Sequence, residues 1–96
     1  MSQVKNQDSL KKAEEYARLI RAELIAIENK NEVLDVINSS DTVADAQSNL
    51  EARFNLDPEQ SKRIVEMRFI NFSRQRVNET RQAYNQALAQ ISELKG

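Results

Sequence analysis

The sequence predicts an all-α protein: an antiparallel two-helix coiled coil capped by a small bundle of short helices. Three observations support this fold class. The 96 residues contain one glycine, Gly96, and one proline, Pro58, so helix breakers are nearly absent. Two segments near the ends carry apolar side chains at alternating spacings of three and four residues. A polar middle segment with turn signals separates them.

The two apolar seams define the arms of the coiled coil. The first arm, about residues 9–29, carries the seam Leu10, Ala13, Ala17, Ile20, Leu24 and Ile27. The second arm, about residues 75–95, carries the seam Val77, Thr80, Tyr84, Ala87, Ile91 and Leu94. Each seam forms one narrow stripe that a single helix cannot bury by itself. We therefore expect the two stripes to pair, with residues 31–73 forming a globular tip.

The first arm has predicted limits at both ends. Residues 1–8 are polar and are expected to form a flexible leader, with Asp8 or Ser9 capping the helix that follows. Residues 9–96 then form a single domain. Asn31 falls where the next apolar seam residue is due, so it predicts the exit from the coiled coil.

The tip is predicted to contain three short helices. An apolar segment at residues 33–37 is followed by a turn signal at residues 38–41. Thr42 and Asp45 then resemble a capping box that opens a helix. Its expected buried face consists of Val43, Ala46, Leu50 and Phe54.

Residues 57–60, Asp-Pro-Glu-Gln, are the sharpest local signal in the chain. They place an aspartate at the cap, a proline at the first helical position and a glutamine at the third. The helix that they open is expected to carry the apolar residues Ile64, Val65, Met67, Phe69, Ile70 and Phe72. The final helix should begin at about Arg74.

This last apolar cluster points around more than one face of a helix. Three short helices offer too little interior to bury all of it, and burying one large apolar side chain contributes about 1.5–3 kcal/mol. Apolar surface left at the tip of a rod is typical of a docking face. The alternative, that residues such as Met67 and Phe69 fill the core of the cap, stays open at this point.

The composition excludes several kinds of chemistry. The chain has no cysteine and no histidine, which excludes thiolate and imidazole ligands or nucleophiles. No carboxylate pair or glycine-rich phosphate loop stands out, so we expect no enzyme activity, catalytic residue, metal site or cofactor. Since an apolar run of about 18 residues and a signal peptide are both missing, we expect a cytoplasmic protein with no membrane segment.

Charge is distributed unevenly, although the net charge is −1. Residues 28–59 carry eight acidic and two basic side chains, whereas residues 62–81 carry six basic and two acidic ones. This asymmetry could favour contact between two copies or a weak phosphate contact, or it is an ordinary solvated surface. Direct DNA binding is not expected, because the net charge is near zero and aromatic residues are few.

Several stretches, in order along the chain, carry a family resemblance. They are Leu10-Lys-Lys-Ala-Glu-Glu, Ala26-Ile-Glu-Asn-Lys-Asn-Glu-Val-Leu, residues 46–50, Arg53-Phe-Asn-Leu-Asp-Pro-Glu-Gln, Ile64-Val-Glu-Met-Arg-Phe, Tyr84, and Ile91-Ser-Glu-Leu. From about Leu10 to Leu94 the chain resembles the coiled-coil and exit-gate segment of the A subunits of bacterial DNA gyrase and topoisomerase IV. The resemblance implies that two tips meet to form a gate through which a DNA duplex leaves.

The resemblance also implies which residues meet a partner. In the family the contact lies around the segment that matches Met67 to Gln75, where the apolar surplus also falls. The predicted interface is Met67, Arg68, Phe69, Ile70, Phe72 and Gln75. The family's Leu-Thr-Gly-Leu-Glu corresponds here to residues 72–76, so Arg74 replaces the glycine and Gln75 replaces an apolar residue. These departures indicate a rebuilt interface or a different partner.

Three functions follow as hypotheses. The first is a non-catalytic dimerisation module that forms a homodimer through the tip. The second is a regulator or inhibitor that pairs with the gate of a gyrase or topoisomerase IV A subunit. The third is an excised fragment of a gyrase A subunit, although Met1 and the polar leader favour a separate gene product. Neither Tyr16 nor Tyr84 matches the DNA-cleaving tyrosine of the family.

Overall fold

The computed structural model describes residues 2–96, which form five α-helices, one 3₁₀ helix and no strand. The elements are α1 (Ser2–Glu28), α2 (Lys30–Asn38), α3 (Val43–Phe54), α4 (Pro58–Val65), η1 (Phe69–Phe72) and α5 (Arg74–Lys95). The all-α class is therefore confirmed. Within these residues, no helix combines the length and the apolar character that a membrane crossing requires.

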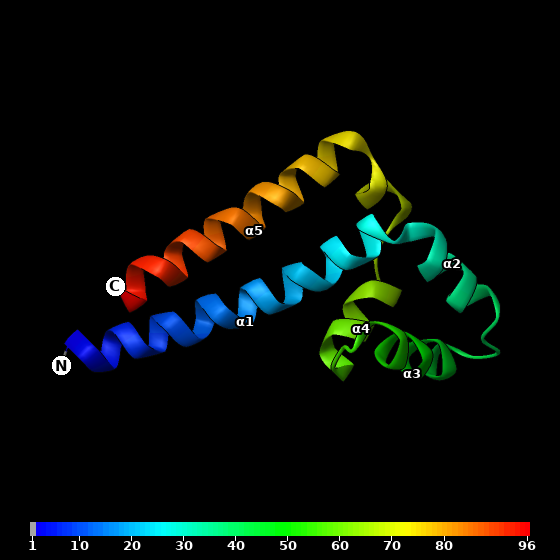
Figure 1. Ribbon diagram of the computed structural model, residues 1–96, viewed down its shortest axis with the longest axis horizontal. Coiled ribbons are helices and arrows are strands. Elements are labelled where there is room, and N and C mark those ends of the chain that lie inside the picture. Colours follow the sequence, from blue (N-terminus) through cyan, green and yellow to red (C-terminus); the bar gives the residue numbers. More distant parts are fainter. Residues whose placement is uncertain (1) are drawn as a thin grey trace.

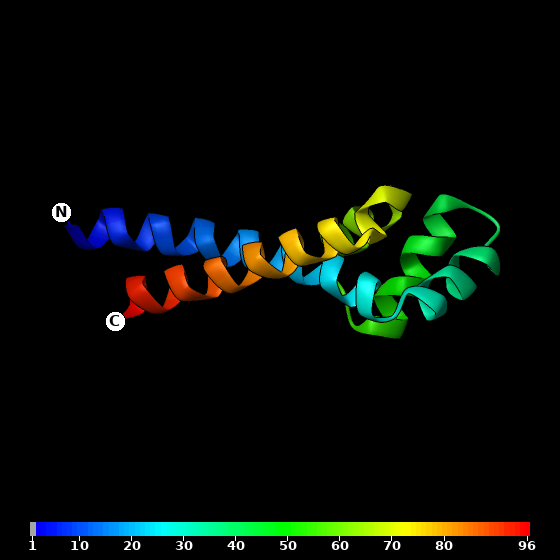
Figure 2. The ribbon, with the colours of Figure 1, turned by 90° about the horizontal axis from the view of Figure 1, so that it is seen from above.

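α1 and α5 run antiparallel and side by side, which gives the molecule its elongated shape of 50 × 27 × 17 Å (Figure 1). The remaining helices gather at one end of this hairpin, and Figure 2 shows the same arrangement from above. Along the seam, Ala13, Ala17, Ile20 and Ala87 are buried. The other seam residues are half-buried: Leu10, Leu24, Ile27, Val77, Thr80, Tyr84, Ile91 and Leu94. This burial is consistent with a coiled coil, whose detailed side-chain interlocking stays a prediction.

Ion pairs flank the seam on one side. Lys95 Nζ lies 3.7 Å from Glu14 Oε2, and Arg81 Nη1 lies 3.9 Å from Glu28 Oε2. Acidic side chains on α1 thus face basic ones on α5. Exposed pairs of this kind contribute about 0.2–1 kcal/mol each, so the apolar seam carries most of the pairing energy.

The start of α1 differs from the prediction. The helix begins at Ser2, so Asp8 and Ser9 lie inside it and the predicted cap at either residue is wrong. No glycine or proline interrupts this stretch, and Lys12 Nζ lies 3.5 Å from Asp8 Oδ2 one helical turn away. Helical backbone therefore extends through the predicted leader, and the division into leader and domain stays a prediction.

The exit from the first arm lies close to its predicted place. α1 ends at Glu28, and Asn29 turns the chain while its Nδ2 donates a hydrogen bond to the carbonyl oxygen of Ile25 at 2.9 Å. α2 follows directly. The break thus falls two residues before Asn31, which lies in the first turn of α2.

The tip packs along the end of α1 rather than only beyond it. α4 contacts the side of α1 opposite α5, so α1 lies between them (Figure 1). Ala22 and Ala26 are fully buried on this side, and their small side chains let α4 approach closely. The tip core consists of Ala22, Ala26, Val33, Leu50, Leu56 and Ile64. This second apolar face of α1 was not predicted.

The predicted N-cap residues of both helices in the tip are confirmed, and the complete capping box is present at α4 alone of the two. Thr42 Oγ1 accepts a hydrogen bond from the Asp45 N–H at 3.0 Å, which caps α3. At α4, Asp57 Oδ1 accepts from the Gln60 N–H at 2.9 Å, and Gln60 Oε1 accepts from the Asp57 N–H at 3.2 Å. These bonds satisfy amide groups that have no partner inside the helix.

One residue of the predicted buried face of α3, Val43, is exposed, so this part of the prediction is wrong. Ala46 and Leu50 are buried and Phe54 is half-buried, but the side chain of Val43 is 67% exposed. Val43 borders a hollow of about 260 Å³ that Ile37 of α2 and Val65 of α4 also line. The helical spacing of Val43 is correct, but the neighbouring helices leave its side chain largely uncovered.

Candidate partner interface on the tip

The segment that connects α4 to α5 does not continue α4, which differs from the prediction. α4 ends at Val65, and the Glu66 and Met67 amides bond back to the carbonyl oxygens of Lys62 and Ile64, both at 3.1 Å. α4 and α5 lie on opposite sides of α1, so the chain must cross over between them (Figure 1). A straight helix through Phe72 could not make this crossing. The prediction of one continuous apolar helix is therefore wrong.

Hydrogen bonds of the backbone and of the Asn71 and Ser73 side chains define the crossing. The Arg68 backbone is extended (φ −92°, ψ 153°), and its N–H donates to Asn71 Oδ1 at 2.7 Å. The Asn71 N–H donates to the Arg68 carbonyl oxygen at 2.9 Å, which closes the first turn of η1. Ser73 Oγ then accepts from the Arg76 N–H at 3.3 Å and caps α5, whose start at Arg74 confirms the prediction.

This geometry leaves most of the predicted interface on the surface. The side chain of Phe69 is 88% exposed and that of Ile70 is 57% exposed. Arg68 and Gln75 are exposed, while Met67 and Phe72 are half-buried. Met67 packs against the tip core, so the alternative that these residues fill the core of the cap holds in part for Met67. The same alternative is wrong for Phe69, and contact of these side chains with a second chain stays a prediction.

Basic residues flank the exposed pair in the sequence. Arg68 and Arg74 are exposed and form no ion pair within the described residues. Arg76 Nη1 lies 3.8 Å from Glu79 Oε1, and Gln75 Nε2 donates to Glu79 Oε2 at 3.2 Å. These three arginines, Arg68, Arg74 and Arg76, are called the basic rim; basic side chains next to apolar ones permit polar contacts at the edge of an interface whose centre is apolar.

Polar contacts attach the tip to α1. Gln60 is buried, and its Nε2 donates to the carbonyl oxygen of Arg18 at 2.9 Å. One turn further along each helix, Arg63 Nε donates to Glu23 Oε2 at 2.7 Å. These contacts fix the position of α4 along α1, and thus the starting point of the crossing segment.

Asp57 combines a helix cap with an ion pair. The Arg18 guanidinium contacts the Asp57 carboxylate, and Arg18 Nη2 lies 3.0 Å from Glu59 Oε1. Partial burial raises the pKa of Asp57, but hydrogen bonds from the Gln60 amide and the Arg18 guanidinium lower this pKa by more than burial raises it. The net pKa lies below the usual value for an aspartate, so the carboxylate keeps its charge, and its ion pair with Arg18, to lower pH than an ordinary aspartate would.

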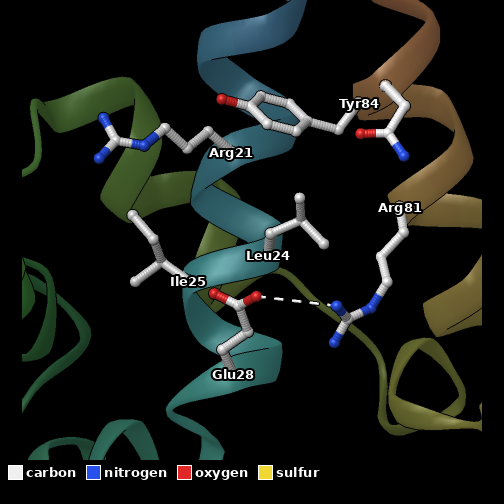
Figure 3. Close-up of a pocket in the computed structure, with 7 residues that line it drawn as sticks. Arg21, Leu24, Ile25, Glu28, Arg81 and Tyr84 are labelled. Atoms are coloured by element: carbon white, nitrogen blue, oxygen red, sulfur yellow. Dashed lines mark ion pairs between the residues drawn. The ribbon is translucent and has the colours of Figure 1, made fainter.

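A separate hollow of about 350 Å³ opens between the arms (Figure 3). The Tyr84 ring lies over Leu24, Arg81 points toward Glu28, and Arg21 extends away from Arg81. Its polar groups therefore do not converge on one point. In the described part of the chain, no three acidic side chains lie close enough together to hold a metal ion.

Comparison with known proteins agrees with the sequence resemblance. The family model of the DNA gyrase/topoisomerase IV A subunit matches residues 1–96. The DNA gyrase A subunit of Fibrobacter succinogenes is 35% identical over 89 residues, which cover 93% of this chain and 10% of that protein. The corresponding gyrase protein of Streptococcus pneumoniae is 34% identical over 83 residues, covering 86% of this chain and 10% of its own length.

The DNA gyrase A subunit of Staphylococcus aureus is 31% identical over 91 residues, which cover 95% of this chain and 10% of that protein. The chain thus spans about a tenth of the length of the relatives that it matches. With the family model covering its whole length, the chain belongs to the family of DNA gyrase and topoisomerase IV A subunits.

Proposed function

We propose that this chain is a non-catalytic dimerisation module that pairs with a second copy through its tip, in the manner of an exit gate. The proposed contact surface consists of Met67, Arg68, Phe69, Ile70, Phe72 and Gln75. The observation that carries the proposal is the 88% exposure of Phe69, with the 57% exposed Ile70 beside it. Two large apolar side chains exposed to water beside the start of α5 favour association.

The area needed for a stable dimer extends beyond these two side chains. A buried aromatic residue covers about 150–250 Å², whereas each partner in a standard interface buries about 800 Å². Phe69 and Ile70 therefore form the centre of the proposed contact, and Met67, Phe72 and the basic rim form its edge. A two-fold axis would bring the same surface of both copies together.

The lack of catalysis is part of the proposal. The relatives are DNA gyrase A subunits, of which this chain spans about a tenth. The sequence has no histidine or cysteine nucleophile, and the side chains around the hollow in Figure 3 do not converge on one point. If the chain is a segment of a longer protein, the same surface would serve as the tip contact of that protein.

Sedimentation of the purified protein at several concentrations tests the proposal. We expect a dimer whose dissociation constant rises about 100-fold or more in the Phe69→Ala variant, because about 1.5–3 kcal/mol is lost in each of two copies. Leu88→Ala is the matched control, since Leu88 is also a large apolar residue, 43% exposed, but lies on α5 away from the tip. A wild-type protein that stays monomeric at about 100 μM would refute the proposal.

A second partner is favoured by the polar residues next to the apolar pair. Arg74 and Gln75 are exposed where the family resemblance places a glycine and an apolar residue. Such changes can select a different partner, and the A subunit of gyrase or topoisomerase IV carries the related surface. The mass of the species that forms when the protein is mixed with purified gyrase A subunit tests for a heterodimer. Unchanged supercoiling activity at excess protein would eliminate an inhibitory role.

A further inference from the structure

The exposed apolar pair is part of a turn that two backbone hydrogen bonds and one side-chain hydrogen bond hold together. Phe69 and Ile70 belong to η1, a 3₁₀ helix of only four residues. Short 3₁₀ helices have poor hydrogen-bond geometry and little stability of their own. The Arg68 N–H, which precedes η1, donates to Asn71 Oδ1 at 2.7 Å. Asn71 thus closes the turn from both its backbone and its side chain.

Asn71 lies where three elements meet. Its half-buried side chain borders a hollow of about 210 Å³, together with Glu23 of α1, Arg63 of α4 and the connecting residues Glu66 and Met67. The side chain therefore lies between the body of the tip and the turn, and its oxygen is bonded to the turn. Phe69 and Ile70 project on the solvent side of the same four-residue helix.

We infer that Asn71 is the positioning residue of the dimer contact: its side chain holds η1 in the binding conformation before a second copy arrives. This inference rests on the proposed dimerisation through the tip. Ordering a backbone segment during association costs conformational entropy, so a turn that is already ordered binds more tightly. Asn71 itself need not touch the partner.

The Asn71→Ala variant tests the inference, because it removes the acceptor for the Arg68 N–H and leaves Phe69 and Ile70 in place. We expect the dimer dissociation constant to rise about fivefold to 100-fold, since one hydrogen bond is lost in each of two copies. The Asn71→Asp variant retains an acceptor oxygen at the same position and should dimerise like the wild type. Asn85→Ala on α5 is the control for an asparagine outside the tip.

Amide hydrogen exchange of the monomer separates positioning from general stability. In samples diluted below the dissociation constant, Asn71→Ala should speed exchange of the amides of Arg68 to Phe72 and leave those of α3 unchanged. The unfolding midpoint of the diluted variant should also stay close to that of the wild type. Faster exchange of the α3 amides together with a lower unfolding midpoint would indicate a structural role instead and would overturn the inference.

The outcomes distinguish the inference from the function on which it rests. A wild-type dimer together with an Asn71→Ala dimer of equal affinity overturns the positioning role and leaves the dimerisation proposal intact. An Asn71→Asp variant as weak as Asn71→Ala also overturns it, because the acceptor oxygen would then have no effect. A wild-type protein that does not associate overturns both.

Discussion

Replacing Leu50 with alanine should destabilise the tip more than any comparable change on the same helix. Leu50 has no exposed surface and lies in the tip core on α3. Its neighbours come from α1, α2 and α4, including Ala22, Val33 and Ile64, so the site can collapse only if several helices move. The truncation should therefore leave a cavity rather than a rearranged core.

The expected loss can be compared with the total stability. Buried Leu→Ala changes cost about 3–5 kcal/mol, and a chain of 96 residues has a free energy of unfolding of about 5–14 kcal/mol. The variant should retain its fold only if the free energy of unfolding of the wild type lies above the lower end of this range. A loss of 3 kcal/mol lowers the unfolding temperature by about 12 °C or more in a domain of this size.

The assay is thermal and urea unfolding followed by circular dichroism at one fixed protein concentration, because association would shift the midpoint. Val43→Ala is the matched control: Val43 lies on the same helical face, but its side chain is 67% exposed. The control should change stability by about 0.5 kcal/mol or less. Equal losses in the two variants, or a negligible loss for Leu50→Ala, would refute this description of the core.

Two further predictions concern the attachment of the tip to α1. Because the pKa of Asp57 is lower in the folded protein, its contribution is complete above the unfolded pKa of about 4 and is lost as pH falls through the folded value. Urea unfolding between about pH 2 and pH 7 should show a smaller acid loss for Asp57→Asn than for wild type. Ala26→Leu should cost about 1–3 kcal/mol in thermal unfolding by overpacking the α1–α4 contact, whereas the exposed Ala89→Leu should be tolerated.

Local chemistry made several elements predictable from the sequence. The caps at Thr42 and Asp57 depend on residues at most three positions apart, and both are confirmed. The arms were predictable because apolar seam residues recur at helical spacing. The surplus of apolar residues after Val65 likewise predicted exposed side chains, and Phe69 and Ile70 are exposed.

The parts that were missed depend on packing between distant segments. Ala22 and Ala26 face α4, but alanine has the highest helix propensity and also occurs on exposed faces, as Ala89 does, so two alanines one turn apart do not identify a buried face. The end of α4 at Val65 follows from the crossing over α1, which no local sequence feature specifies. Asn71 was overlooked because its role appears only once that turn exists.

The central place of α1, with α5 on one side and α4 on the other, limits how its length can change during evolution. One inserted or deleted residue would rotate all later side chains by about 100°, because an α-helix has 3.6 residues per turn. Such a change between Ala17 and Ala22 would move both contact faces out of register at once. Substitutions should therefore accumulate in this helix much more readily than gaps, whereas the bend between α2 and α3 can vary in length.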